Sequence, residues 1–112
     1  MIDIDVSRLN HVTLVEVNGR IDGITAPQLG IVLKEQLARD QRQLVIDLSG
    51  VEYMSSAGLR ELVTALKVAR QQDGGDLRVA RPIERVREIM ELAGLHQIVR
   101  IYATPDEAIA SF

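Results

Sequence analysis

The fold is decided by the stretch from Gln43 to Arg60, which reads QLVIDLSGVEYMSSAGLR. Its first part is a continuous apolar run, broken only by Asp47, of the kind that forms a strand buried on both faces. Four small residues, Ser55 to Gly58, follow at the point where a helical pattern begins. A helix start carries unpaired backbone N–H groups and about half a positive charge. The stretch therefore predicts a buried strand that leads through a polar turn into a helix, with the turn as the working site.

Composition limits the classes of function. A length of 112 residues predicts one domain spanning residues 1–112, and 46% hydrophobic with 26% charged residues is typical of a globular protein. A net charge of −3 and only 3% aromatic residues argue against nucleic-acid binding, which needs basic surfaces or stacking platforms. The absence of cysteine excludes disulfides, Cys-ligated metals and thiol nucleophiles.

The N-terminus, Met1 to Asp5, lacks a basic segment followed by an apolar one. No apolar run approaches the length of about 18 residues that a membrane span needs. We therefore expect a cytoplasmic protein without direct membrane insertion.

The N-terminal third predicts two strands and a helix. Apolar residues alternate with aspartates over residues 2–6, and residues 12–17 form a second strand that the turn dipeptide Asn18-Gly19 is expected to end. Thr25 and Gln28 have the spacing of a capping box, with Pro27 in the first turn of the helix. The apolar face of this helix is predicted to contain Leu29, Val32, Leu33 and Leu37.

A second helix is predicted to begin at Ser56 and to stop at Gly74-Gly75, where glycine can adopt the left-handed conformation that closes a helix. Residues 77–80 then form a short strand. The apolar positions of the helix keep a helical spacing: Leu59, Leu62, Val63, Leu66 and Ala69.

The C-terminal third repeats the alternation. Pro82 is expected to open a third helix that stops at Gly94, residues 98–102 form a last strand, and Thr104 to Glu107 form a second capping box before a short terminal helix. The third helix is expected to point Ile83, Val86, Ile89, Met90 and Ala93 inward. Strands that alternate with helices predict an α/β fold with a mixed sheet of about five strands and about four helices.

Enzyme motifs are missing. Gly58 follows Ser56 at the spacing of a nucleophile elbow, but Met54 stands where the motif needs its first glycine. A triad built from Ser56, an aspartate and either His11 or His96 has no supporting pattern, and these two histidines do not form a metal-ligand cluster. Glycine-rich phosphate loops are also absent. We therefore expect no catalytic residues, no metal and no cofactor.

The two hydroxyls at the predicted helix start have two interpretations. Either Ser55 or Ser56 caps the helix, which contributes about 1 kcal/mol. Alternatively, one of them is phosphorylated, because the helix dipole and free amides at a helix start favour a phosphate. The residues alone leave both open.

These residues resemble a known family. The segment from Tyr53 to Leu59, preceded by residues 45–49 and by Gly19 to Asp22, is similar to the STAS domain of bacterial anti-sigma factor antagonists. The likeness continues through Gly74-Gly75 and residues 94–99, so it covers nearly the whole chain. The resemblance implies the STAS fold.

The resemblance also implies a site. Ser56 matches the serine that accepts a phosphate in the family, and Asp22 matches an acidic residue beside it. Ser55 replaces the usual aspartate, and Ala57 replaces the usual serine or threonine. The partner-binding surface implied in this way comprises Asp22, Ser55, Ser56, Ala57, Gly58, Leu59 and Arg60.

The implied function is that of an anti-sigma factor antagonist. In its unphosphorylated state the protein would bind an anti-sigma factor Ser/Thr kinase and release a sigma factor; phosphorylation would end the interaction, and a Ser/Thr phosphatase would restore it. Because Ser55 and Ala57 differ from the usual residues of the family, an alternative function is also considered: a scaffold or accessory subunit that is not phosphorylated, such as a stressosome or lipid-transport component. The exposed first strand leaves a homodimer open as well.

Overall fold

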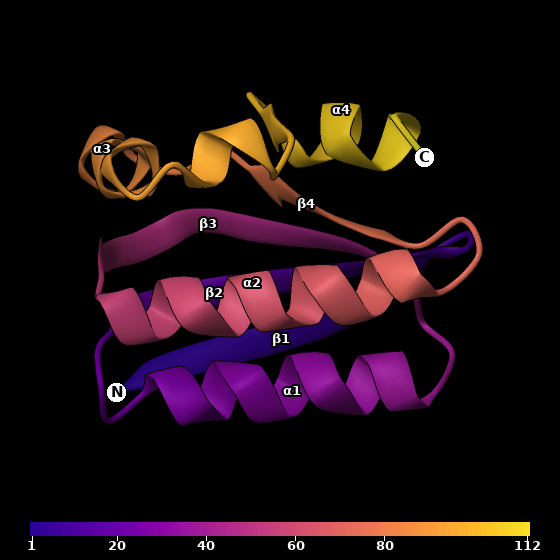
Figure 1. Ribbon diagram of the computed structural model, residues 1–112, viewed down its shortest axis with the longest axis horizontal. Helices are drawn as coiled ribbons and strands as arrows, with labels where there is room; N and C mark the ends of the chain where they lie inside the picture. Colours follow the sequence, from indigo (N-terminus) through magenta and orange to yellow (C-terminus); the bar gives the residue numbers. More distant parts are fainter.

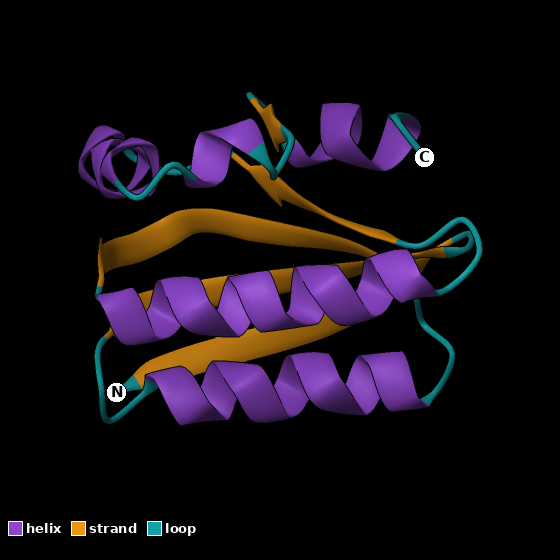
Figure 2. Cartoon of the chain, viewed as in Figure 1, coloured by secondary structure: helices purple, strands orange, loops and turns teal.

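The computed structural model describes all residues 1–112 and contains five strands, four α-helices and one 3₁₀ helix. The strands form a single sheet in the order β1-β2-β3-β4-β5, with the helices packed against it (Figures 1 and 2). The predicted mixed sheet is confirmed. The elements are β1 (Ile2–Leu9), β2 (Val12–Ile21), α1 (Ala26–Ala38), β3 (Gln43–Met54), α2 (Ser56–Gln71), β4 (Asp76–Ala80), α3 (Glu84–Leu92), η1 (Leu95–Gln97), β5 (Ile101–Tyr102) and α4 (Pro105–Ala110).

Strand pairing follows the connections. β1 and β2 form an antiparallel hairpin, whose tight turn holds Asn10 in the left-handed region at φ 60°. The pairs β2 with β3, β3 with β4, and β4 with β5 are all parallel, as crossover connections through helices require. β1 is therefore an edge strand, whereas β3 lies in the middle of the sheet.

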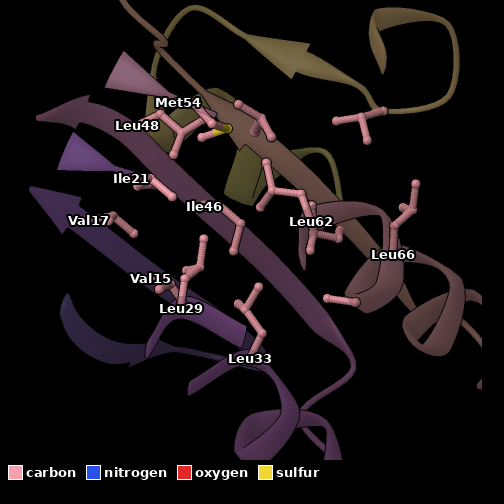
Figure 3. Close-up of a cluster of buried hydrophobic side chains, with 14 of the residues drawn as sticks. Val15, Val17, Ile21, Leu29, Leu33, Ile46, Leu48, Met54, Leu62 and Leu66 are labelled. Atoms are coloured by element: carbon pink, nitrogen blue, oxygen red, sulfur yellow. The ribbon is translucent and has the colours of Figure 1, made fainter. Parts of the chain in front are cut away.

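The core lies mainly on one face of the sheet. Side chains that point from β2 and β3 toward that face meet leucines of α1 and α2, as Figure 3 shows, and α3 adds Val86 and Met90 to the same cluster. The opposite face carries a smaller cluster covered by α4: Val12, Leu14, Val45, Ala80 and Ala108. In β3, Leu44, Ile46 and Leu48 belong to the main cluster and Val45 to the small one, so both faces of the strand are buried and its sequence is a continuous apolar run.

The predicted end of the second strand is wrong. β2 continues through Asn18-Gly19 to Ile21, and its pairing with β3 shifts register after Glu16 and again after Gly19. Gly19 has φ 115°, a conformation that glycine adopts at little cost. The dipeptide therefore makes an irregularity within a strand held by two neighbours, rather than a turn.

Two helix ends also differ from the predictions. α2 ends at Gln71, and Gly74, the residue in the left-handed conformation, lies in the loop beyond it. α3 begins at Glu84 rather than at Pro82, because Ile83 has extended backbone at the N-cap position. Ile83 is consequently exposed at its surface rather than pointing inward.

The remaining differences concern the inward face of α3 and the last strand. Only Val86 and Met90 of α3 are buried, while Ile89 is half-buried and Ala93 is exposed. Gly94, at φ 75°, does end the helix as predicted. The strand expected over residues 98–102 is limited to β5, because the preceding residues form η1 and a turn.

Candidate functional site

The predicted site lies where two helices begin. β2 and β3 run parallel, and the chain leaves both at the same end of the sheet to enter α1 and α2, which start at the left in Figure 1. The backbone N–H of Ser55 donates to the carbonyl oxygen of Ile21 at 2.8 Å. This bond holds the β2–α1 turn beside the start of α2, although the two are more than thirty residues apart in the sequence.

Ser55 and Ser56 have different environments. Ser55 is the N-cap of α2, and its Oγ accepts a hydrogen bond from the N–H of Gly58 at 3.4 Å. Ser56 is the first residue of the helix, is exposed and has no side-chain hydrogen bond to the protein. The capping interpretation therefore belongs to Ser55, which leaves the hydroxyl of Ser56 free.

Gly58 lets the first turn of α2 pack closely on the sheet. It is buried, and a Cβ added there would lie 2.6 Å from Ile21 Cγ2 and 2.9 Å from Met54 Cγ. Its φ is not in the left-handed region, so the requirement is for space rather than for backbone freedom. Any side chain here would push the start of α2 away from the ends of β2 and β3.

Asp22 organises the β2–α1 turn. Its Oδ1 accepts hydrogen bonds from the N–H groups of Ile24 at 2.9 Å and Thr25 at 3.0 Å. These backbone hydrogen bonds, that of Thr25 foremost, lower the pKa of Asp22 below its usual value, so the carboxylate is charged at neutral pH. The turn thus presents a fixed negative charge on the side of the molecule where α2 begins.

The capping box predicted for α1 is wrong. Thr25 does precede the helix, but it has helical backbone and makes no side-chain capping bond to the first turn. Its hydroxyl instead donates to the carbonyl oxygen of Arg20 at 2.7 Å and accepts from the N–H of Asp22 at 2.9 Å. In the first turn of the helix, the N–H of Gln28 donates to the carbonyl oxygen of Thr25 at 2.9 Å rather than to its hydroxyl, so the Thr25 side chain braces the turn.

The rest of the predicted surface lies on the first turn of α2. Ala57 and Leu59 are half-buried against the core, whereas Arg60 is exposed. One contact near this end was not predicted: the guanidinium of Arg20 stacks over the ring of Tyr53, 4.3 Å from its centroid. The sequence gives no signal for this pair, which depends on the register of β2 against β3.

Two buried aspartates form ion pairs that were not predicted from the sequence. Asp47, noted only as a break in the apolar run, pairs with Arg81 at 3.1 Å, and Asp76 lies between Arg70 at 2.8 Å and Arg78 at 3.0 Å. Burial opposes the ionisation of both carboxyls, but the hydrogen bonds from these arginines outweigh it and lower both pKa values. These pairs join β3, β4 and α2.

No group of three or more histidine, aspartate or glutamate side chains is arranged to hold a metal ion. None of the helices is both long enough and apolar enough to cross a membrane.

Comparison with known proteins identifies the family. The sequence profile of the STAS domain matches residues 3–108. The chain belongs to the STAS domain family. The anti-sigma-F factor antagonist RsfB of Mycobacterium tuberculosis is 36% identical over 109 residues, which is 96% of this chain and 87% of that protein. The anti-sigma-B factor antagonist of Bacillus subtilis is 32% identical over 111 residues, with 96% and 97% covered.

Solved structures show the same STAS fold. An anti-sigma factor antagonist from Mycobacterium paratuberculosis superposes with a TM-score of 0.91 at 31% identity, covering 99% of this chain and 93% of the other. The phosphorylated form of SpoIIAA from Bacillus has a TM-score of 0.75 at 14% identity, with 97% and 98% covered, so that likeness concerns the fold alone.

Proposed function

We propose that this STAS domain is an anti-sigma factor antagonist controlled by phosphorylation of Ser56. Unphosphorylated, it binds an anti-sigma factor Ser/Thr kinase and thereby releases a sigma factor. The kinase then transfers the γ-phosphoryl group of ATP to Ser56 Oγ, with ADP as the other product, and the complex separates. A Ser/Thr phosphatase restores the binding form. The chain itself is a substrate and binding partner, without catalysis of its own.

The observation that carries this proposal is the division of roles between the two serines. Ser55 Oγ accepts from the N–H of Gly58, so modifying it would remove a helix cap. Ser56 is exposed and its hydroxyl has no protein partner, so a kinase can reach it without breaking a bond of the fold. The relatives named as anti-sigma factor antagonists support the proposed function of the chain.

Electrostatics explain how the modification would act. A phosphate adds a charge of about −1.5 to −2, which the first turn of a 16-residue helix tolerates because its amides and dipole are positive. The phosphate would join the ionised Asp22, presented by the adjacent turn. A partner that fits the unphosphorylated surface would then face the charge of the phosphate in addition to that of Asp22. Loss of only about 1.4 kcal/mol weakens binding tenfold.

The first test incubates the protein with ATP and an anti-sigma factor Ser/Thr kinase from its native host, and then measures the intact mass. We expect the mass of one phosphoryl group on the unmodified chain and on Ser55→Ala, and none on Ser56→Ala. If Ser56→Ala is phosphorylated and Ser55→Ala is not, Ser55 is the acceptor and the assignment of Ser56 is wrong.

A second test separates charge from size. Ser56→Asp and Ser56→Asn have side chains of nearly equal volume, and only the first adds a negative charge. We expect Ser56→Asp to lose capture of the kinase while Ser56→Asn retains most of it, with both melting near the unmodified protein. Equal capture by the two variants would contradict an electrostatic switch.

The second candidate is a STAS scaffold or accessory subunit that binds its partner without phosphorylation. It is favoured by Ser55 and Ala57, which replace the residues that the family usually has on either side of the acceptor. Under this alternative, the protein purified from its native host would carry no phosphate in any growth state. Ser56→Ala would also leave partner capture and its regulation unchanged.

A further inference from the structure

A groove lies between the two long helices, α1 and α2. α1 and α2 lie side by side and point the same way across the sheet (Figure 1), and between them is an open cavity of about 530 Å³. This volume is within the range of small-molecule sites, which are mostly apolar with a few polar groups. Its apolar floor and walls include Leu33, Leu37, Ala65 and Val68.

Two apolar side chains at the rim of the groove are exposed. Ile31 on α1 is 58% exposed and Val68 on α2 is 38% exposed. Leu33, Leu37 and Ala65 are almost completely buried beneath them. A ligand lying in the groove would therefore cover two exposed apolar side chains without disturbing the core.

A glycine on α1 brings a carboxylate into the groove. The side chain of Glu61, from α2, lies across Gly30, where a methyl group would overlap Oε1. Glu61 is half-buried, forms none of the four ion pairs of the chain and accepts no hydrogen bond from it. A carboxylate at the side of an apolar groove without a protein partner is complementary to a cation.

The other charged side chain of the groove is Lys34, one turn along α1 from Gly30. It is exposed and does not pair with Glu61. A long, solvated side chain of this kind can turn its ammonium group into water. The carboxylate of Glu61, in contrast, lies over Gly30 at the side of the groove, so it is the charge that a ligand meets there.

We propose that the groove between α1 and α2 binds amphiphilic cations, with an ammonium group paired to Glu61 and an alkyl chain lying toward Val68. Residues 61 and 68 are two turns apart on α2, or about 10 Å at 1.5 Å per residue. An extended alkyl chain of about eight carbons spans that distance. The chain would contact Leu37, Ala65 and Val68, and the pairing group would sit above Gly30. This site is separate from Ser56, and the inference does not depend on the proposed function.

The test compares three eight-carbon probes that differ only in the head group: octylammonium, octanol and octanoate. The two ionic probes are titrated into the full chain below their micelle concentrations and octanol below its solubility limit, and binding is followed by methyl NMR shifts. We expect saturable shifts at Leu37, Ala65 and Val68, with octylammonium binding at least tenfold tighter than octanoate and more tightly than octanol. Equal binding of the three probes, or shifts confined to other surfaces, would overturn the proposal.

Matched variants assign the charge. Glu61→Gln is expected to remove the preference for octylammonium while keeping the weak binding of octanol. Lys34→Gln, the control on the opposite wall, is expected to leave octylammonium binding unchanged or stronger. If Glu61→Gln retains the preference, the carboxylate has no part in binding. If the same methyl signals shift with protein concentration alone, a second copy of the chain occupies the groove and the proposal is wrong.

Discussion

The close packing of Gly58 gives a sharp test of how α2 is seated on the sheet. Gly58→Ala adds a methyl group 2.6 Å from Ile21 Cγ2 and 2.9 Å from Met54 Cγ, two side chains that are almost completely buried. Overpacking of a well-filled core costs about 1–3 kcal/mol. Alanine offsets about 0.5–1 kcal/mol of this through its better helix propensity. We expect a net loss of about 1–2 kcal/mol in the free energy of unfolding.

Gly30→Ala is the matched control, because it makes the same substitution in α1, the other long helix on the same face of the sheet. Here the atoms nearest to the added methyl group all belong to the carboxylate of Glu61, the end of a flexible side chain that can rotate toward water. The helix propensity gain of about 0.5–1 kcal/mol therefore survives, and this variant is expected to equal or exceed the parent in stability.

Urea unfolding at neutral pH measures the free energy of unfolding of both variants. The comparison is valid if this free energy falls with urea concentration at the same slope in the two variants. The predicted difference between them is about 2 kcal/mol. For domains near this size, each kcal/mol shifts the melting temperature by about 4–8 °C. If Gly58→Ala is as stable as Gly30→Ala, the start of α2 has room to move, and the space argument for Gly58 is refuted.

Three further predictions concern the ion pairs and the last helix. The pKa of Asp47 is lowered in the folded state, so the stabilisation by its carboxylate is complete above about pH 4 and is lost as pH falls through the folded pKa. In urea unfolding, the stability difference between the parent and Asp47→Asn is therefore expected to shrink on acidification. A difference that stays constant down to about pH 3 would contradict this. Thr104→Ala removes the cap at Glu107 N (3.1 Å) and is expected to cost about 1 kcal/mol in thermal unfolding, with Thr104→Ser as a nearly neutral control. Phe112→Leu removes the ring that lies 3.9 Å from the Arg78 guanidinium; we expect a loss of about 0.5–1 kcal/mol, and an unchanged urea midpoint would show that the contact contributes nothing.

The two capping boxes explain how far local sequence signals extend. At α4, Thr104 has extended backbone and its hydroxyl accepts from the N–H of Glu107 as predicted. At α1 the same spacing fails, because Thr25 has helical backbone and its hydroxyl donates to the carbonyl oxygen of Arg20. The two sequence patterns are of the same kind, and the backbone conformation of the threonine decides whether its hydroxyl caps the helix.

The candidate site was predictable as a place but not in its details. The apolar run and the small residues after it located the turn between β3 and α2, which the structure places there. The sequence could not decide which serine caps the helix, because either hydroxyl could reach the free amides of the first turn. The extended backbone of Ser55, which makes it the N-cap, is known only from the structure. The groove was invisible in the sequence, since it depends on Gly30 meeting a side chain of another helix.

The position of α4 has a consequence for how the molecule opens. This six-residue helix covers the small apolar cluster on the face of the sheet opposite the main core. Local openings in proteins range in free energy from near zero up to that of global unfolding, and short elements with little buried area open first. The C-terminal helix can therefore detach and return while the main core stays closed. Amides of α4 would then exchange with solvent long before those of β3, and the turn that carries Ser56 would keep its shape during such fluctuations.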